Sequence, residues 1–425
     1  MKIIKATDIT PEQIVSQRNV AYVSVEESVK KVLNDVSERG DAALREYELR
    51  FDGVQIDDFA VTAEEIDAAV AAVGAEYVRI LKRAAANIER FHRAQIRSDF
   101  SMNYDGITVG ERFIPVQSAG LYVPGGTARY PSSVLMNCVP AKLAGVQNII
   151  ICTPPSKDGR IPDGILAAAK VAGADKVYKV GGAQAIAAMA YGTESIPKVD
   201  KIVGPGNVYV ATAKKLVQGI CGIDMIAGPS EILVIADETA NADWLAADLL
   251  SQAEHDKLAS AIMITDSEAL ATAVSAAVEK RLEKLPRREI ATESIKNNGK
   301  IIITESIMQA AELSDRIAPE HLELAVARPE KLLEQIKNAG SVFLGHYTPE
   351  ATGDYMAGTN HTLPTGGTAR FSSPLGVDDF IKKTQFIKMS REALENYYRD
   401  IAAFAESEGL NAHAESVKAR FESND

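Results

Sequence analysis

The sequence predicts an α/β fold with two parallel β-sheets, each covered by helices on both faces. Short apolar runs with the length of strands alternate with helical segments from residue 107 to residue 304. Strands that are buried on both faces are apolar throughout, and their alternation with helices is typical of parallel sheets. The chain has 425 residues, which exceeds one ordinary domain, and its strands are numerous enough for two sheets.

Composition and charge narrow the class of protein. Hydrophobic residues make up 46% of the chain and charged residues 24%, as in a globular protein with a substantial core. The net charge of −12 argues against nucleic acid or an anionic membrane as a partner and tolerates a small cationic substrate. The three cysteines, Cys138, Cys152 and Cys221, are too few for a disulfide framework. Because no apolar leader and no run of transmembrane length is present, we expect a cytoplasmic enzyme.

The first hundred residues predict mainly helices. A strand over Lys2–Lys5 and a helix that begins at Pro11 belong to a short arm over residues 1–22. Helices follow over Val25–Glu38 and Ala63–Arg97, and the second has apolar residues at helical spacing.

Strands and helices then alternate in chain order. The expected strands are Ile149–Thr153, Lys176–Val180, Lys201–Val203, Ile232–Ala236, Ala261–Thr265 and Lys300–Thr304. The expected helices are Ser132–Leu143, Ile161–Ala172, Ala183–Tyr191, Tyr209–Gln218, Asp243–Asp256 and one that ends at Leu285. The charged tail is expected to be helical over Val377–Ile387, Arg391–Gly409 and Asn411–Ser423.

Three Gly-rich turns join strands to helices and indicate a dinucleotide site. The usual G-x-G-x-x-G fingerprint is absent, but G-L-Y-V-P-G-G from Gly120, G-G-A-Q-A at 181–185 and G-P-G-N at 204–207 all follow strands. Such turns lie where strand carboxyl ends meet helix N-termini, which is where dinucleotides bind in α/β sheets. One such turn alone is common in any α/β fold, so the indication comes from the three together.

The helix over Asp243–Asp256 offers two metal ligands on one face. Gln252 and His255 are three residues apart, so an amide oxygen and an imidazole nitrogen can reach the same point. Zinc normally takes about four ligands, so the others must come from elsewhere in the protein. The alternative is a solvated Gln and a His near a helix C-terminus.

The segment R-I-A-P-E-H-L-E-L at 316–324 offers a base and a carboxylate. Pro319 suits the first position of a helix, which would put Glu320 and His321 in the first turn. The positive end of the helix dipole disfavours imidazolium, so His321 would stay neutral and accept a proton. A plain helix start with no catalytic role is the alternative.

Two further segments carry polar residues of the types that hold metals and substrates. Asp354 lies between two glycines in T-G-D-Y-M-A-G-T-N-H, on an expected loop, with His361 seven residues later. In the tail, Gly409 is expected to end one helix and Asn411 to cap the next, which brings Glu408 and His413 near a sharp corner. The alternative is that both segments are ordinary surface turns with no binding role.

Together these stretches resemble the histidinol dehydrogenase family over essentially the whole chain. The shared order is G-L-Y-V-P-G-G, G-G-A-Q-A, G-P-G-N, A-G-P-S-E, S-Q-A-E-H-D, A-P-E-H-L, G-D-Y, N-H-x-L-P-T-G-G and E-G-L-x-A-H. The resemblance implies NAD-dependent oxidation of L-histidinol to L-histidine through the aldehyde, which ends histidine biosynthesis. It also implies a metal-containing homodimer whose two Rossmann-like domains are related to the aldehyde dehydrogenase fold.

The resemblance also implies domain boundaries. Residues 23–120 and 230–376 would form a discontinuous Rossmann-like domain with the metal and catalytic residues, and residues 121–229 an inserted NAD-binding domain. Residues 377–425 would form a C-terminal helical unit exchanged between subunits, so that both subunits share each active site.

Residue roles follow from the same resemblance. The metal, zinc with manganese or cobalt as substitutes, would be held by Gln252, His255, Asp354 and His413. The implied catalytic residues are Glu320 and His321. The implied NAD contacts are Tyr122, Gln184 and Asn207. The implied substrate contacts are Ser230, His321, His361, Glu408 and the four metal ligands.

The chemistry implied by these roles makes His321 the base and Glu320 the group that activates water for hydration of the aldehyde. The metal would orient the substrate more than it would activate it. A thiohemiacetal route through Cys138 or Cys152 is the rival for the second oxidation, although the surroundings of Cys152 are apolar. Two other readings are a metal-free aldehyde dehydrogenase-like enzyme with a nucleophilic Cys, and a non-catalytic zinc protein that binds histidine-like ligands.

Overall fold

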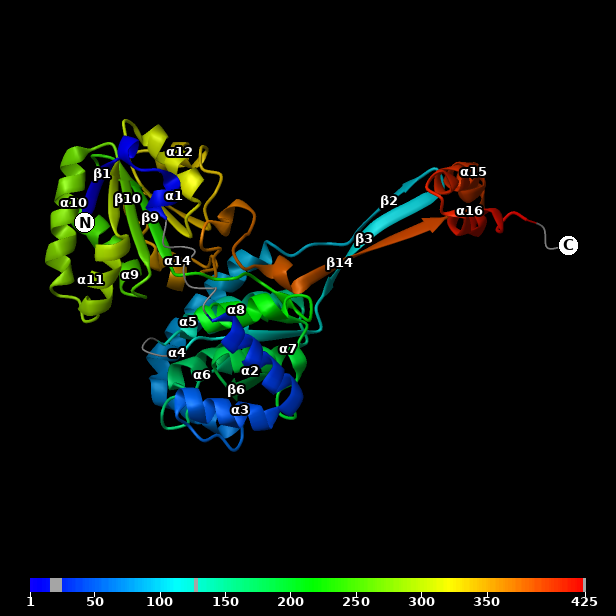
Figure 1. Ribbon diagram of the computed structural model, residues 1–425, viewed down its shortest axis with the longest axis horizontal. Coiled ribbons are helices and arrows are strands. Elements are labelled where there is room, and N and C mark those ends of the chain that lie inside the picture. Colours follow the sequence, from blue (N-terminus) through cyan, green and yellow to red (C-terminus); the bar gives the residue numbers. More distant parts are fainter. Residues whose placement is uncertain (16–24, 126–128, 423–425) are drawn as a thin grey trace. The chain divides into compact units, whose positions relative to one another are not determined.

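The computed structural model of the protein describes residues 1–15, 25–125 and 129–422 (Figure 1). The end of the expected 1–22 arm, part of the Gly120–Pro131 loop and the expected helical end at Ser423 lie outside these residues. The chain divides into two compact units. The first contains residues 1–95 and 116–380, and the second contains residues 96–115 and 381–425.

The first unit contains a parallel sheet of six strands in the order β1-β11-β10-β9-β12-β13. The strands are β1 (Lys2–Lys5), β9 (Glu231–Ala236), β10 (Ser260–Thr265), β11 (Lys300–Ile303), β12 (His321–Ala325) and β13 (Ser341–Leu344). All six residues of the inner strand β9 are buried, as its apolar sequence predicts.

Helices cover both faces of this six-stranded sheet (Figure 1). One face packs against α9 (Ala242–Ala253), α10 (Glu268–Leu282) and α11 (Arg288–Asn298). The other packs against α1 (Pro11–Ile14), α12 (Ile307–Ile317) and α13 (Pro329–Leu333). The expected N-terminal arm therefore contributes an edge strand and a short helix to this sheet.

A second parallel sheet, of five strands, lies in the same unit in the order β6-β5-β4-β7-β8. Its strands are β4 (Ser118–Tyr122), β5 (Asn148–Thr153), β6 (Lys176–Lys179), β7 (Lys201–Val203) and β8 (Gly222–Ile223). One face packs against α2 (Glu26–Arg39), α3 (Asp41–Tyr47), α7 (Gly182–Tyr191) and α8 (Val208–Val217). The other packs against α4 (Ala63–Arg93), α5 (Pro131–Ala144) and α6 (Asp163–Ala172). The predicted fold of two doubly covered parallel sheets is confirmed.

One grouping differs from the expected domains. Residues 23–120 were expected to belong with the six-stranded sheet, but the described helices α2, α3 and α4 pack on the five-stranded sheet. The backbone supports this packing, because Ala60 forms a β-bridge with Tyr178 and Lys179 N–H donates to the Phe59 carbonyl. The apolar faces of these helices fit either sheet, so their periodicity alone does not choose between them.

The second unit is built on an antiparallel sheet of three strands, β14-β3-β2. Its strands are β2 (Phe100–Tyr104), β3 (Ile107–Pro115) and β14 (Ile381–Met389), and two helices follow, α15 (Arg391–Ser407) and α16 (Asn411–Lys418). The helix expected over Val377–Ile387 is wrong, because only Val377–Phe380 is helical, as a 3-10 turn, and β14 begins at Ile381. The long pairing of β14 with β3 explains the difference, since it joins residues far apart in the sequence.

Within the described residues, every helix is too short or too polar to cross a lipid bilayer.

Candidate active site

His321 is the first residue of strand β12 and does not lie in a helix, so the predicted helix start at Pro319 is wrong. Helix α12 ends before Pro319 at Ala318, whose backbone is left-handed at φ 53°. Beyond that turn the chain enters the sheet, where Ser341 N–H donates to the Glu320 carbonyl at 2.9 Å. Pairing with β9 and β13 therefore decides the conformation, and the helix dipole does not act on His321.

Burial, and not the helix dipole, favours the neutral imidazole that was expected at His321. The His321 ring is buried, which lowers the pKa of its imidazole below the usual value. Burial also raises the pKa of the Glu320 carboxyl well above its usual value. The Glu320 Oε2 atom lies 3.6 Å from His321 Nδ1 and accepts a hydrogen bond from Glu231 N–H at 2.8 Å. Both pKa shifts favour the uncharged forms, so charge attraction contributes little to this contact.

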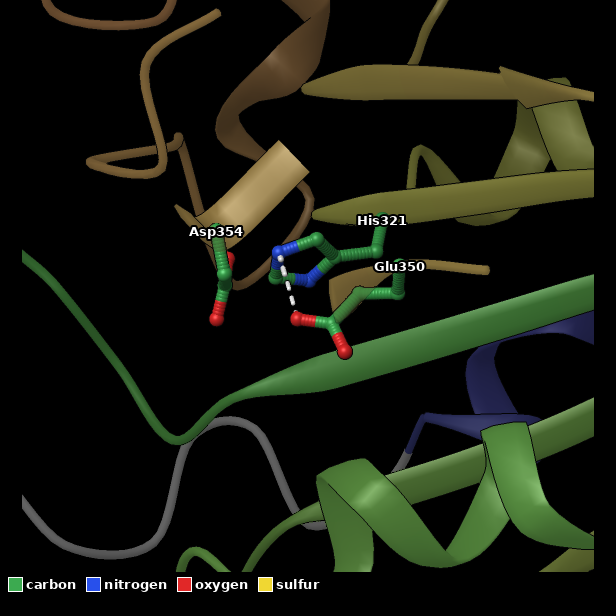
Figure 2. A group of neighbouring side chains, drawn as sticks. All are labelled: His321, Glu350 and Asp354. Carbon is green, nitrogen blue, oxygen red and sulfur yellow. Dashed lines mark ion pairs between the residues drawn. The ribbon is translucent and has the colours of Figure 1, made fainter. Parts of the chain in front are cut away.

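The His321 ring is held by one nitrogen and leaves the other without a partner. Nδ1 lies 3.0 Å from the Glu231 carbonyl and 2.8 Å from the Gln252 amide nitrogen. Nε2 is buried and has no hydrogen-bond partner, and it lies 3.7 Å from Glu350 Oε1 (Figure 2). With the proton on Nδ1, that atom donates to the Glu231 carbonyl and the Nε2 lone pair faces the carboxylates. With the proton on Nε2, Nδ1 accepts from the Gln252 amide instead, so a base at Nε2 requires the first tautomer.

Glu350 and Asp354 face this nitrogen from the segment after β13. Asp354 lies in the short helix α14 (Ala351–Tyr355), not on a loop as expected, and Glu350 is the N-cap of this helix. One ligand atom from each of His321, Glu350 and Asp354 lies within 4.8 Å of the others (Figure 2). Burial, followed by the Glu350 charge, raises the pKa of Asp354 to about 8. Two carboxylates this close, one buried and one partly buried, favour a cation between them.

His361 completes this side of the site. Its Nδ1 lies 3.7 Å from Asp354 Oδ1, and its Nε2 lies 3.4 Å from the Ser133 hydroxyl on α5. Burial lowers the pKa of His361 to about 4, so its imidazole is neutral at physiological pH. His361 therefore links the two sheet layers of the first unit as a neutral polar group.

The expected ligands Gln252 and His255 lie at the C-terminal end of α9. Gln252 is in its last turn, and His255 lies just beyond the end of the helix, so the expected extent to Asp256 is slightly too long. The Gln252 Oε1 atom is buried without a hydrogen-bond partner. His255 and Asp354 both line a cavity of about 530 Å³, whose other walls come largely from α4 and α5. The buried Gln252 oxygen without a donor, with the His255 imidazole one helical turn further on, fits a zinc, manganese or cobalt ion.

The expected cofactor residues lie at the carboxyl ends of the other sheet. Tyr122 is the last residue of β4, Gln184 lies in the first turn of α7, and Asn207 caps α8 after β7. The order of the strands reverses at β4, since β5 and β6 are added on one side of it and β7 and β8 on the other, while all five strands stay parallel. Ligands of open parallel sheets bind at such a reversal.

A buried ion pair that the sequence reasoning missed supports the turn at Gly204. Lys214 Nζ donates to the Gly204 carbonyl at 2.8 Å, and Asp224 Oδ2 accepts from Gly204 N–H at 2.8 Å. Lys214 and Asp224 also form an ion pair with each other, and both charged groups are almost fully buried. The two lysines of the largely apolar helix α8, Lys214 and Lys215, were the available signal. Glu350 had a signal too, because it precedes Asp354 by four residues and so shares its face on a helix.

The remaining expected residues are less informative. Ser230 is half-buried and precedes β9, where its carbonyl accepts from Ser260 N–H at 3.0 Å. Glu408 and His413 belong to the second unit, and both are exposed there. Gly409 ends α15 with a left-handed φ of 76°, as predicted. Asn411 is the first residue of α16 and not its cap.

Comparisons with known proteins agree over the full length. The family model described as histidinol dehydrogenase matches residues 15–421. The histidinol dehydrogenase of Bacillus cereus is 55% identical over 95% of this chain and 94% of that protein. The crystal structure of histidinol dehydrogenase from Elizabethkingia anophelis has a TM-score of 0.94 at 41% identity, covering 99% of this chain and 98% of that one. Betaine aldehyde dehydrogenase from Staphylococcus aureus shares the fold, with a TM-score of 0.50 at 12% identity over 91% of this chain and 92% of that one.

Proposed function

Because the chain belongs to the histidinol dehydrogenase family, we propose that it oxidises L-histidinol to L-histidine through L-histidinaldehyde with NAD, as the last steps of histidine biosynthesis in the cytoplasm. The observation that carries the proposal is the buried pair Glu320 and His321, with His321 Nε2 open beside two carboxylates. A neutral buried imidazole with a free lone pair is what removal of a hydroxyl proton needs.

His321 acts as the general base in both oxidations. Its Nε2 takes the carbinol proton, and the electron density left on oxygen expels the C–H hydride. When bound, NAD accepts that hydride, once from the alcohol and once from the hydrated aldehyde. The contact of Nδ1 with the Glu231 carbonyl keeps the ring oriented while Nε2 gains its proton.

Glu320 activates water for hydration of the aldehyde. Its carboxyl is fixed by Glu231 N–H, and burial raises its pKa, which makes the ionised carboxylate a stronger base than an exposed one. The water proton moves to the ionised Glu320 carboxylate as the hydroxyl adds to the aldehyde carbon, and its return to the former carbonyl oxygen gives the gem-diol, which then loses a proton to His321. Glu320 is therefore assigned to the second oxidation, and His321 to both.

The metal site is proposed to consist of Gln252, His255 and Asp354 with His413 of the partner subunit. The unpartnered Gln252 oxygen and the shared cavity of His255 and Asp354 support this set. When bound, the zinc ion, or manganese or cobalt in its place, holds the imidazole and amine of the substrate. Ser230, His361 and the partner subunit's Glu408 are proposed as further substrate contacts.

A homodimer with shared active sites accounts for the surface of the second unit. This small unit exposes several large apolar side chains, which soluble monomers rarely leave uncovered as a group. They are Ile96, Phe100, Met102, Tyr104, Phe386, Ile387, Tyr397, Ile401, Phe404 and Leu410. Mixing a Gln252→Ala chain with a His413→Ala chain should restore activity, because one of the two hybrid sites is intact. Demonstrated heterodimers without activity would argue that both residues serve the same chain's site.

The deciding experiment measures the stoichiometry of the reaction. Incubation with limiting L-histidinol and excess NAD should form about two NADH per histidinol, since two hydrides leave the substrate. Removal of metal by a chelator should abolish turnover, and zinc should restore it. One NADH per histidinol, or full turnover after verified metal removal, would contradict the proposal.

A further inference from the structure

A buried carboxyl ties the N-terminal segment to the turn that carries Gln184. Glu48 is fully buried and begins a single π-helical turn, Glu48–Asp52, directly after α3. Its Oε1 atom accepts a hydrogen bond from Gln184 Nε2 at 2.9 Å and another from Gly181 N–H at 3.2 Å. One oxygen therefore holds both a side-chain amide and the backbone at the start of α7.

The same turn is held from its other side by a second proposed cofactor residue. The Tyr122 hydroxyl accepts a hydrogen bond from Gly182 N–H at 3.0 Å. Tyr122 comes from β4 and Glu48 from the N-terminal segment, so two separate parts of the fold converge on consecutive backbone amides. The turn they fix is one of the three Gly-rich connections at the carboxyl edge of the five-stranded sheet.

One amide oxygen in this cluster lacks a donor. Gln184 Oε1 is buried and has no hydrogen-bond partner among the described residues. Native proteins rarely leave buried acceptors unpaired, so this atom points to a donor that the described residues do not supply. The Gln184 Nε2 atom donates to Glu48, and this hydrogen bond fixes the orientation of the amide group. The amide oxygen, Oε1, therefore faces away from Glu48. A hydroxyl or amine of a dinucleotide is a donor of the required kind.

Glu48 is suited to accept hydrogen bonds without placing a charge in the core. Burial, and to a lesser degree the neighbouring Asp52 carboxyl, raises the pKa of Glu48 to about 8. At neutral pH the group is therefore largely the neutral acid, whose carbonyl oxygen still accepts from both donors.

We propose that Glu48 is a positioning residue for dinucleotide binding, which fixes the Gln184 amide and the Gly181–Gly182 turn against Tyr122. The inference rests on the proposed function, because Gln184 and Tyr122 are cofactor residues only if the enzyme uses NAD.

The test compares three variants of the full-length enzyme. Glu48→Leu removes the acceptor, Glu48→Gln keeps an acceptor oxygen in nearly the same place, and Asp41→Ala is the matched control. Asp41 is a buried carboxylate of the same N-terminal segment, but it accepts from Ser195, in the loop after the opposite end of α7. It should therefore report the structural cost of losing a buried carboxylate on this segment.

The measurements are the Kd of NAD by calorimetry, KM for each substrate, kcat and the melting temperature. Glu48→Leu should raise the Kd and KM of NAD about tenfold, the loss expected for one good hydrogen bond, with kcat and the KM of histidinol nearly unchanged. Glu48→Gln should bind NAD within about twofold of the unsubstituted enzyme, as an acceptor is retained. Asp41→Ala should lower the melting temperature and leave NAD binding unchanged.

Three results would overturn the inference while the unsubstituted enzyme binds NAD: normal binding by Glu48→Leu, a loss in Glu48→Gln as large as in Glu48→Leu, or an equal loss in Asp41→Ala. If Glu48→Leu does not fold, Glu48→Ser, which leaves room for water, carries the same expectation. An unsubstituted enzyme that does not bind NAD would refute the proposed function itself, and the inference with it.

Discussion

The two parallel sheets of the first unit have the same architecture but place their polar groups at opposite edges. In the six-stranded sheet Glu231 and His321 begin their strands, so they lie at the amino edge, next to the C-terminal end of α9 that carries Gln252. In the five-stranded sheet Tyr122 ends its strand and Asn207 begins a helix, so they lie at the carboxyl edge.

The helix dipole gives this difference a physical meaning. Helix N-termini, at the carboxyl edge, carry partial positive charge and favour phosphates, whereas helix C-termini, at the amino edge, carry partial negative charge and favour cations. A dinucleotide suits the first edge, and a metal ion with an amine substrate suits the second. If the proposed NAD and metal sites are correct, groups of opposite charge would bind at opposite edges of two sheets with the same architecture.

The largest expected effect tests the amino edge. His321→Gln removes the base, so kcat should fall by about 10³-fold or more in both oxidations, while the Kd of NAD stays within about twofold. Rapid-mix assays with histidinol and with histidinaldehyde measure the two steps. His346→Gln is the matched control, because His346 lies in the same unit and its ring contacts the exposed Thr239 hydroxyl. If His321→Gln also weakened NAD binding, the catalytic site and the NAD site would not be separated at the two edges.

A smaller effect separates the two oxidations. Glu320→Gln keeps the size of the side chain but cannot take a proton from water. Aldehyde oxidation should fall by about 10²-fold and alcohol oxidation by only a few-fold, measured in the same assays. Equal losses in both half-reactions would refute the assignment of Glu320 to hydration.

The third prediction tests the carboxyl edge with a pair of helix caps. Asn207 caps α8 by accepting from Tyr209 and Val210 N–H, and Asn241 caps α9 in the same way in the other sheet. Each Ala substitution should destabilise the protein by about 1 kcal/mol in chemical unfolding. Only Asn207→Ala should also raise the KM of NAD, by about tenfold. A matching rise in Asn241→Ala would show that the KM reports stability and not the site.

The smallest expected effect concerns the thiols. Cys152 is fully buried in β5, and burial raises the pKa of its thiol far above the usual value, so it is a poor nucleophile. Cys152→Ala should keep kcat for aldehyde oxidation within about twofold, with a modest loss of stability from the small cavity. Abolished aldehyde oxidation in a folded variant would instead support a thiohemiacetal route.

Local sequence patterns predict most of the first unit but not its long-range choices. Short apolar runs predict strands well. The strand expected over Lys201–Val203, for example, is β7 in the structure and has the same bounds. Pro319 suits either a helix start or an extended segment, and only pairing with β9 and β13 places His321 in a strand. The same holds for Ile381–Met389, whose partner strand lies more than 260 residues earlier in the chain.

The candidate site shows the same limit. His321 and Asp354 carry recognisable chemistry in short motifs, and the structure brings them together. Glu48 and Lys214 carry no motif, because their roles arise from burial against segments that are distant in sequence. Whether Glu408 and His413 reach a partner's site depends on a second chain, which no property of one chain's local sequence specifies.

The left-handed turn at Ala318 has a consequence for engineering this enzyme. The left-handed conformation destabilises the folded state by about 1 kcal/mol when the residue is alanine, but not when it is glycine. Ala318→Gly is therefore an obvious thermostabilising substitution. Yet the turn sets the angle at which α12 passes into Pro319, Glu320 and His321, and glycine would loosen that angle. We therefore expect Ala318→Gly to raise the thermal stability of the enzyme and to lower its turnover.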